Sequence, residues 1–256
     1  MADEANRERD LHRTLVVGLG GTGHEVCTYL KKVLLEENQF DRDRTAHVKL
    51  LSIDTDEGAA IQENSLAIGG TQAVELLPHE ERMVVDLPDG LDLSRFEWFP
   101  ADLLRRQAMD SRGKGAGRYR AIGRLFLAAN WSRVYREVAQ LLNDLQKKEI
   151  ADTLSWARDN EVQLAKETQV FVVGNLVSGT CSGMFLEFGY LLRQVMGVGR
   201  MRIIGLFTIA KHNQYTVARK AANCMQRCAN WTTTPEIGSI RPPSCAGIPD
   251  IGATRT

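Results

Sequence analysis

The sequence predicts an α/β fold: a parallel sheet with helices on both of its faces. Short apolar runs rich in β-branched residues alternate along the chain with stretches of helical periodicity, which is the order of elements in such a fold. The runs expected to form strands begin near residues 14, 48, 170 and 202. Two of them lead directly into small-residue loops followed by a helical pattern, at residues 18–23 and 178–183.

Composition excludes several classes of protein. The 256 residues can bury a sizeable core, and the 32 basic residues equal the 32 acidic ones, so no net charge attracts nucleic acid. No apolar run reaches the roughly 18 residues of a membrane span. The five cysteines are scattered, and Cys224 and Cys228 lack a second pair of metal ligands at suitable spacing. We expect a cytoplasmic protein without a metal site, a membrane span or a nucleic-acid partner.

Three parts are expected along the chain. Residues 1–13 form a polar leader, and residues 14–231 form one domain. Residues 232–256 contain four of the seven prolines and no apolar periodicity, so we expect a disordered tail. Within the domain, residues 57–113 show only weak patterns, with a short strand at 83–87 and a short helix near 103–108.

The first glycine loop joins the strand at residues 14–17 to a helix. Its glycines at 18, 20 and 23 have the G-x-G-x-x-G spacing of dinucleotide-binding loops, which is a weak signal by itself. A Rossmann domain places an acidic residue about 20 positions further on, at the end of its second strand. Asp54 directly follows the strand at 48–53, but it lies 31 residues after Gly23 and not about 20.

The central loop follows the strand at residues 170–173 and consists of six small residues, 178–183. Such a loop lets backbone N–H groups approach an anion, and the dipole of the following helix favours negative charge. A phosphate site and a tight turn between strand and helix are both compatible with this pattern.

The third glycine loop, residues 112–123, is basic. Lys114, Arg118 and Arg120 are suited to pair with phosphate charge or to face solvent or a partner. A helical pattern then extends over residues 120–159, with a break expected at 130–132, and the strand at 201–209 precedes a further helix.

The central loop resembles the tubulin/FtsZ signature GGGTGSG. It matches at Gly179, Thr180, Ser182 and Gly183, and it departs from the signature at 177, 178 and 181. The first glycine loop lies where that family wraps the nucleotide phosphates, although Glu25 replaces the usual asparagine there.

Two further segments share this resemblance. Residues 50–56, LLSIDTD, are similar to the second strand of the family with its Asn-Thr-Asp triplet, with Asp54 in the position of the asparagine. Residues 115–117 and Gly123 reproduce the GAG-x5-G loop that contacts the terminal phosphates in FtsZ-like proteins. Lys211 and Arg219 fall near residues that border the ribose.

The resemblance implies a Rossmann-like tubulin/FtsZ nucleotide-binding domain of the divergent bacterial kind, which binds GTP or GDP with Mg²⁺ held through the phosphates. The resemblance also implies self-association into filaments and is compatible with other protein partners. It implies that hydrolysis needs a second domain absent from this chain, so no catalytic residue is assigned. The residues expected to bind nucleotide are Gly20, Gly21, Thr22 and Gly23 of the first loop, Asp54 and Thr55 after the second strand, Gly115, Ala116 and Gly117 of the third loop, and Ser178, Gly179, Thr180, Cys181, Ser182 and Gly183 of the central loop.

Two other functions are compatible with the same residues. A Rossmann domain that binds NAD(P) would use Gly18, Gly20, Gly23 and Asp54. An interaction module with the same fold would have lost its nucleotide, which the departures at Ser178, Cys181 and Glu25 allow. The preference for guanine over adenine is also open.

Overall fold

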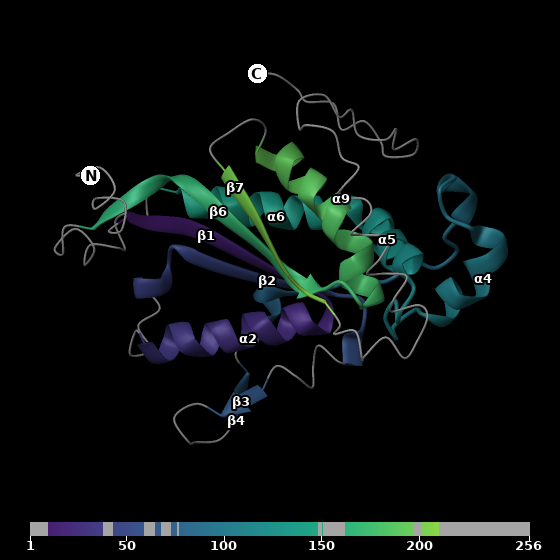
Figure 1. Ribbon diagram of the computed structural model, residues 1–256, viewed down its shortest axis with the longest axis horizontal. Helices are drawn as coiled ribbons and strands as arrows, with labels where there is room; N and C mark the ends of the chain where they lie inside the picture. Colours follow the sequence, from purple (N-terminus) through teal and green to yellow (C-terminus); the bar gives the residue numbers. More distant parts are fainter. Residues whose placement is uncertain are drawn as a thin grey trace.

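The computed structural model describes residues 10–37, 43–58, 65–67, 73–75, 77–147, 150, 162–196 and 201–209. Their main element is a five-stranded sheet with the order β5-β2-β1-β6-β7, in which every neighbouring pair is parallel (Figure 1). The strands are β1 (Asp10–Leu19), β2 (Val48–Asp54), β5 (Arg82–Val84), β6 (Gln163–Asn175) and β7 (Met201–Thr208). A separate antiparallel pair is formed by β3 (Ser65–Ala67) and β4 (Ala73–Glu75).

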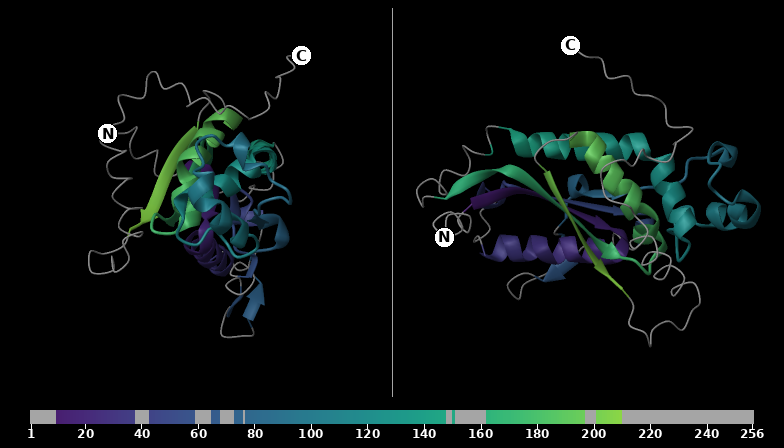
Figure 2. Two further views of the ribbon diagram at one scale, coloured as in Figure 1. Left: turned by 90° about the vertical axis from the view of Figure 1, so that its right-hand side faces the viewer. Right: turned by 45° about the horizontal axis from the view of Figure 1, so that its top comes forward.

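Helices cover both faces of the sheet. Figures 1 and 2 show α2 (Gly20–Glu37) on one face and α6 (Trp131–Gln146) and α9 (Gly179–Met196) on the other. The remaining elements are α4 (Ala101–Asp110), α5 (Arg120–Ala129), and the short 3₁₀ helices η1 (Asp43–Thr45), η2 (His79–Glu81) and η3 (Leu93–Arg95). The predicted α/β class, with a parallel sheet between two layers of helices, is therefore confirmed.

The alternation of side chains along β1 divides the core in two. Leu15, Val17 and Leu19 belong to the larger cluster, which includes the buried residues of α5, α6 and α9. Val16 points to the opposite face and belongs to a smaller cluster with Cys27 of α2. This period of two is the expected pattern for a strand that is buried on both faces.

The start of β1 differs from the expected boundary. The polar leader was expected to reach residue 13, but β1 begins at Asp10, because residues 10 and 11 pair with residues 163 and 164 of β6. Backbone pairing decides this boundary, and it does not depend on apolar side chains. The helix break at 130–132 is confirmed, since α5 ends at Ala129 and α6 begins at Trp131. Residues 1–9, the helix expected after residue 210, and the tail at 232–256 lie outside the described residues.

A close backbone contact holds the start of α2 against β1. A Cβ atom on Gly18 would lie 2.2 Å from the carbonyl oxygen of Gly23, and one on Gly23 would lie 2.8 Å from that of Val173. Both neighbours are backbone atoms, which cannot move aside cheaply. The outer glycines of the first loop therefore allow the helix to pack closely on β1 and β6.

A buried histidine lies directly behind the first loop. His24 is fully buried, and its Nδ1 lies 2.9 Å from the hydroxyl oxygen of Ser52 on β2. Burial, with a smaller contribution from the charge of Arg82, lowers the pKa of His24. Burial also lowers the pKa of His47, so both imidazoles stay neutral in the folded protein at neutral pH. Within the described part of the chain, no helix has the length and apolar character needed to cross a membrane.

The close contact at Gly18 gives a prediction about stability. Gly18→Ala is expected to lower the free energy of unfolding by about 2 kcal/mol or more, because the new methyl group overlaps the backbone at Gly23. Urea unfolding followed by circular dichroism measures the change. The matched control is Gly189→Ala in α9, where a Cβ meets nothing within 4 Å. That variant should be about as stable as the parent or up to about 1 kcal/mol more stable, since alanine favours helix. Equal stability of the two variants would contradict the packing argument.

The neutral histidines give a prediction about pH. Below about pH 6.5 the unfolded chain binds protons at residues 24 and 47 that the folded protein does not bind, because their folded pKa values are lowered. The contribution of these two histidines to the free energy of unfolding should therefore be constant above pH 7. It should decrease as the pH falls from 6.5 towards 5, by at most about 1.4 kcal/mol per pH unit for each histidine. Denaturant unfolding at several pH values measures this slope. His24→Gln should reduce the slope, and an unchanged slope would exclude His24 as a source.

Candidate functional site

The sheet has a topological switch point between β1 and β6. These two strands are neighbours, and the helices that follow them, α2 and α9, leave towards opposite faces of the sheet (Figures 1 and 2). In open α/β sheets, ligands bind beyond the carboxyl ends of the strands at such a point. The first loop lies at the end of β1 and the central loop lies at the end of β6. The fold thus places both small-residue loops where a ligand is expected.

The starts of the two helices are in contact at this point. Gly20 has a φ of 74°, and a Cβ atom there would lie 3.2 Å from the Cβ of Thr180. Only glycine adopts this conformation without strain, so the loop can turn sharply from β1 into α2. Because α2 begins at Gly20, the amides of residues 20–23 have no partner within the helix. Together with the helix dipole, these amides form an environment that favours an anion.

The segment after β2 is joined to the central loop by a pair of hydroxyl groups. Thr55 is fully buried, and its Oγ1 lies 2.7 Å from Oγ1 of Thr180, so one of the two donates to the other. Asp54 is also buried, and its Oδ1 accepts hydrogen bonds from the amides of Thr55 at 2.6 Å and Asp56 at 3.4 Å. Asp54 therefore shapes the turn that presents the Thr55 hydroxyl.

The third glycine loop completes the group. Gly115 and Gly117 have φ values of 79° and 56°. The amide of Ala116 donates to Oγ1 of Thr55 at 2.9 Å, and the amide of Gly179 donates to the carbonyl oxygen of Gly117 at 2.8 Å. The structure thus brings together all four segments that the sequence singled out.

The amides at the start of α9 are partly bonded within the protein. Besides the bond from Gly179 to Gly117, the amide of Cys181 donates to Oγ of Ser178 at 3.2 Å. The same hydroxyl donates to the carbonyl oxygen of Asn175 at 2.9 Å. Ser178 therefore caps α9, and the position that departs from the tubulin/FtsZ signature has a structural role here.

Several side chains of the expected site point into the protein. The Cys181 thiol is fully buried, and its sulfur lies 2.5 Å from where a Cβ of Gly174 would be. Ser182 is fully buried as well, so both residues offer a ligand only their backbone. Gly183 packs against α5, where a Cβ would meet the Arg120 carbonyl oxygen and the Arg124 nitrogen at 2.5 Å. Glu25 is exposed on α2.

The basic residues of the third loop have different environments. Lys114 and Arg118 are exposed, while Arg120 is half-buried at the start of α5. Burial lowers the pKa of Arg120, and the nearby carboxylate of Glu187 on α9 opposes that shift. Lys211, Arg219, Cys224 and Cys228 lie outside the described residues, so the expected ribose contacts and the cysteine pair have no structural description.

The sequence did not reveal three residues that shape these loops. Asn175 ends β6, and its Oδ1 accepts the amide of Val177 at 2.8 Å. Asp86 holds the amide of Gly113 at 3.2 Å, and His24 bonds Ser52 behind the first loop. Asparagine and aspartate next to small or turn residues are a signal for such turns. The long-range partners of Asp86 and His24 have no signal in the sequence.

Solved structures of CetZ proteins are similar to this fold. CetZ from Methanosaeta thermophila superposes with a TM-score of 0.51 at 11% identity, covering 87% of this chain and 43% of that protein. The GDP-bound monomer of CetZ1 from Haloferax volcanii gives 0.45 at 14% identity, covering 85% and 47%. The GTPγS-bound protofilament of CetZ2 from the same organism gives 0.43 at 14% identity, covering 84% and 44%.

The chain thus spans less than half the length of these proteins. At such low identity the likeness to the Methanosaeta thermophila protein shows the fold alone, which is the predicted α/β fold with a parallel sheet. No curated protein sequence matches the chain. The model of the family described as "tubulin like" matches residues 15–226, and the chain therefore belongs to the tubulin-like family.

Proposed function

We propose that this chain is the guanine-nucleotide-binding domain of a tubulin-like, filament-forming GTPase. The observation that carries the proposal is the meeting of four loops at the switch point between β1 and β6, beside the amides that begin α2. Family membership supports the same function.

Each loop receives a role in this proposal. The amides of Gly20, Gly21, Thr22 and Gly23 lie along the α and β phosphates, since the start of α2 offers them to an anion. Thr180 and the third loop lie beside the terminal phosphate. Mg²⁺ binds through the phosphates, because this ion keeps several waters and uses few protein ligands.

Guanine is proposed because the loops resemble those of the tubulin/FtsZ family and the chain belongs to the tubulin-like family. CetZ1 was solved with GDP and CetZ2 with GTPγS, the latter as a protofilament. Self-association into filaments is proposed on the same ground. The cysteine pattern supports a cytoplasmic location, and the two described cysteines, Cys27 and Cys181, are buried and form no disulfide.

A second function is favoured by one specific observation. The amides of Gly179 and Cys181 are already bonded to Gly117 and Ser178, which leaves the start of α9 less open to a phosphate than the start of α2. This arrangement suits an interaction module that keeps the fold and binds no nucleotide. A Rossmann domain that binds NAD(P) is the third possibility, and family membership speaks against it.

Hydrolysis is proposed to need residues beyond this chain. Among the carboxylates beside the loops, Asp54 and Asp56 accept hydrogen bonds from their own segment: Asp54 from the amides of Thr55 and Asp56, and Asp56 from the amide of Gly58 at 3.0 Å. These loops also supply amides, hydroxyls and the exposed basic side chains of Lys114 and Arg118, which bind phosphate but do not activate water.

The proposed phosphate site predicts a specific effect of charge at Thr22. Thr22→Glu places a carboxylate in the first turn of α2, where a negative charge stabilises the helix but repels phosphate. The affinity for GTP with Mg²⁺ should fall by about tenfold or more, while the thermal unfolding midpoint stays within a few degrees. Thr22→Gln, which has the same size without the charge, should lose much less affinity. Calorimetric titration of protein stripped of nucleotide measures both.

The outcomes of this titration separate the three functions. Saturable GTP binding that NAD does not displace, with the charge effect at Thr22, supports the proposal. Binding of NAD but not of GTP would establish the Rossmann alternative. Absence of binding to GTP, GDP, ATP and NAD would favour the interaction module. Equal affinities of Thr22→Glu and Thr22→Gln for GTP would show that the phosphates do not bind at the start of α2.

If hydrolysis needs residues beyond this chain, the chain alone should hydrolyse GTP slowly. The purified, monodisperse chain should bind GTP yet release phosphate at a rate close to that of free GTP, because no described group is placed to activate water. A phosphate-release assay with and without Mg²⁺ measures this rate. Sustained magnesium-dependent turnover by the monodisperse protein would contradict the prediction and place the catalytic groups within this chain.

A further inference from the structure

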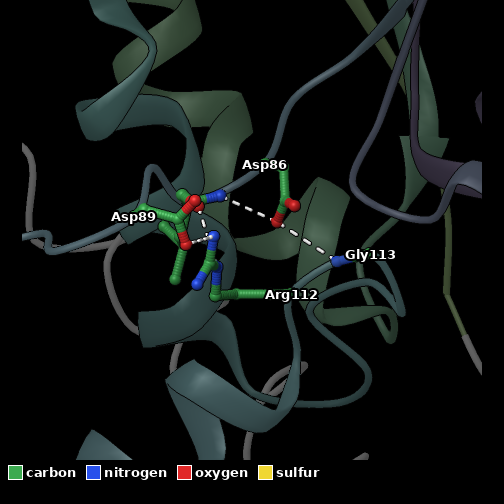
Figure 3. A network of polar contacts seen from close by, with 5 residues as sticks. Asp86, Asp89, Arg112 and Gly113 are labelled. Atoms are coloured by element: carbon green, nitrogen blue, oxygen red, sulfur yellow. Dashed lines mark hydrogen bonds and ion pairs between the residues drawn. The ribbon is translucent and has the colours of Figure 1, made fainter.

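Asp86 connects the end of β5 to the start of the third glycine loop. It follows β5 by two residues, and its Oδ1 accepts the amides of Leu87 at 2.8 Å and Gly113 at 3.2 Å. Figure 3 shows this carboxylate between its own turn and Gly113. The contact joins residues that lie 27 positions apart in the sequence.

Other contacts keep this turn in place. The side-chain amide of Asn130, between α5 and α6, donates to the carbonyl oxygen of Asp86 at 2.7 Å. The Nε atom of Arg112 donates to the carbonyl oxygen of Leu87 at 3.0 Å, and its guanidinium forms an ion pair with Asp89 (Figure 3). Leu87 is buried in the core. The carboxylate of Asp86 is thus held by a turn that is itself anchored to the core and to α5.

The third loop depends on such contacts for its conformation. Gly113, Gly115 and Gly117 all have positive φ values, of 66°, 79° and 56°. Glycines occupy many backbone conformations in solution, so this alternating path needs partners to fix it. Three partners come from the candidate site itself: Asp56 pairs with Lys114, Thr55 with Ala116, and Gly179 with Gly117. Asp86 holds the loop from the opposite end, away from the switch point.

We propose that Asp86 is a positioning residue, which sets the affinity of the site for the terminal phosphate by holding the third loop at Gly113. This inference rests on the proposed nucleotide-binding function, in which the third loop lies beside the terminal phosphate. Loss of the carboxylate frees one end of the loop, and the loop must then be ordered when the triphosphate binds. In the proposed arrangement a diphosphate lacks the phosphate that this loop contacts, so the affinity for a diphosphate should be insensitive to Asp86.

The test compares GTP with GDP. In Asp86→Ala, the affinity for GTP should fall by about three- to tenfold, the effect of one lost hydrogen bond, while the affinity for GDP changes by less than about twofold. Asp86→Asn should retain most of the GTP affinity, because its amide oxygen can still accept from Gly113. The matched control is Asp92→Ala, which removes an exposed carboxylate that caps η3 through Ser94 in the same region. It should leave both affinities unchanged.

The GTP to GDP ratio separates positioning from general destabilisation, because an unstable fold weakens both nucleotides together. An unchanged ratio in Asp86→Ala would overturn the inference, and so would a parallel loss of both affinities. If Asp86→Ala does not fold, Arg112→Gln serves instead, since it removes the guanidinium bond to Leu87; a GTP-selective loss is again expected, and an unaltered ratio again refutes the role. Parent protein that binds neither nucleotide would refute the proposed function itself.

Discussion

The parallel pairing of β1 with β6 is the interaction on which the rest of the structure depends. It places two strands side by side whose following helices leave towards opposite faces, and it thereby creates the switch point. The first and central loops are adjacent only because residues 14–19 and 169–174 are in register. Backbone contact at Gly18 and Gly23 then seats α2 against both strands. Without this pairing, the two small-residue loops would be ordinary turns on separate elements.

Glycines in these loops serve two different physical purposes. Gly20, Gly115 and Gly117 have positive φ values and shape the path of the chain. Gly179 lies where a Cβ would meet the carbonyl oxygens of Gly117 at 2.7 Å and Ala116 at 2.8 Å, so its small size allows two loops to touch. A bulky residue at Gly179 would therefore separate the loops before it blocked any ligand. Loss of binding in such a variant would not locate the phosphate, whereas a charge added at the start of α2 tests phosphate binding directly.

Hydroxyl and carboxylate groups connect the loops in a chain of short contacts. Thr55 bonds Thr180 and Ala116, and Asp54 turns the segment that presents Thr55. These groups are buried, so leaving one of them without a partner would cost free energy, and the contacts act together to define one arrangement. Among these loops, the conformation of the third loop depends most on contacts with its neighbours, because three of its residues are glycines that favour no single conformation in isolation. Its geometry is consequently decided by neighbours on β5, on the β2 segment and on α9.

Hydrophobic periodicity and small-residue runs are local properties of the chain, and they were enough to predict the class of fold, the strands near residues 14, 48, 170 and 202, and the residues of the loops. The antiparallel pair β3 and β4 was not predicted. The break at residue 130 followed from the same patterns, whereas β6, Gln163–Asn175, is much longer than the strand expected at residues 170–173. Only the tertiary structure decided that β1 extends back to Asp10, that Cys181 and Ser182 face inward, and that Ser178 caps α9. It also decided the roles of Asp86 and His24, whose partners lie 27 and 28 residues away. These features depend on contacts between segments that are distant in the sequence, and such contacts produce no periodic pattern from which they could be predicted.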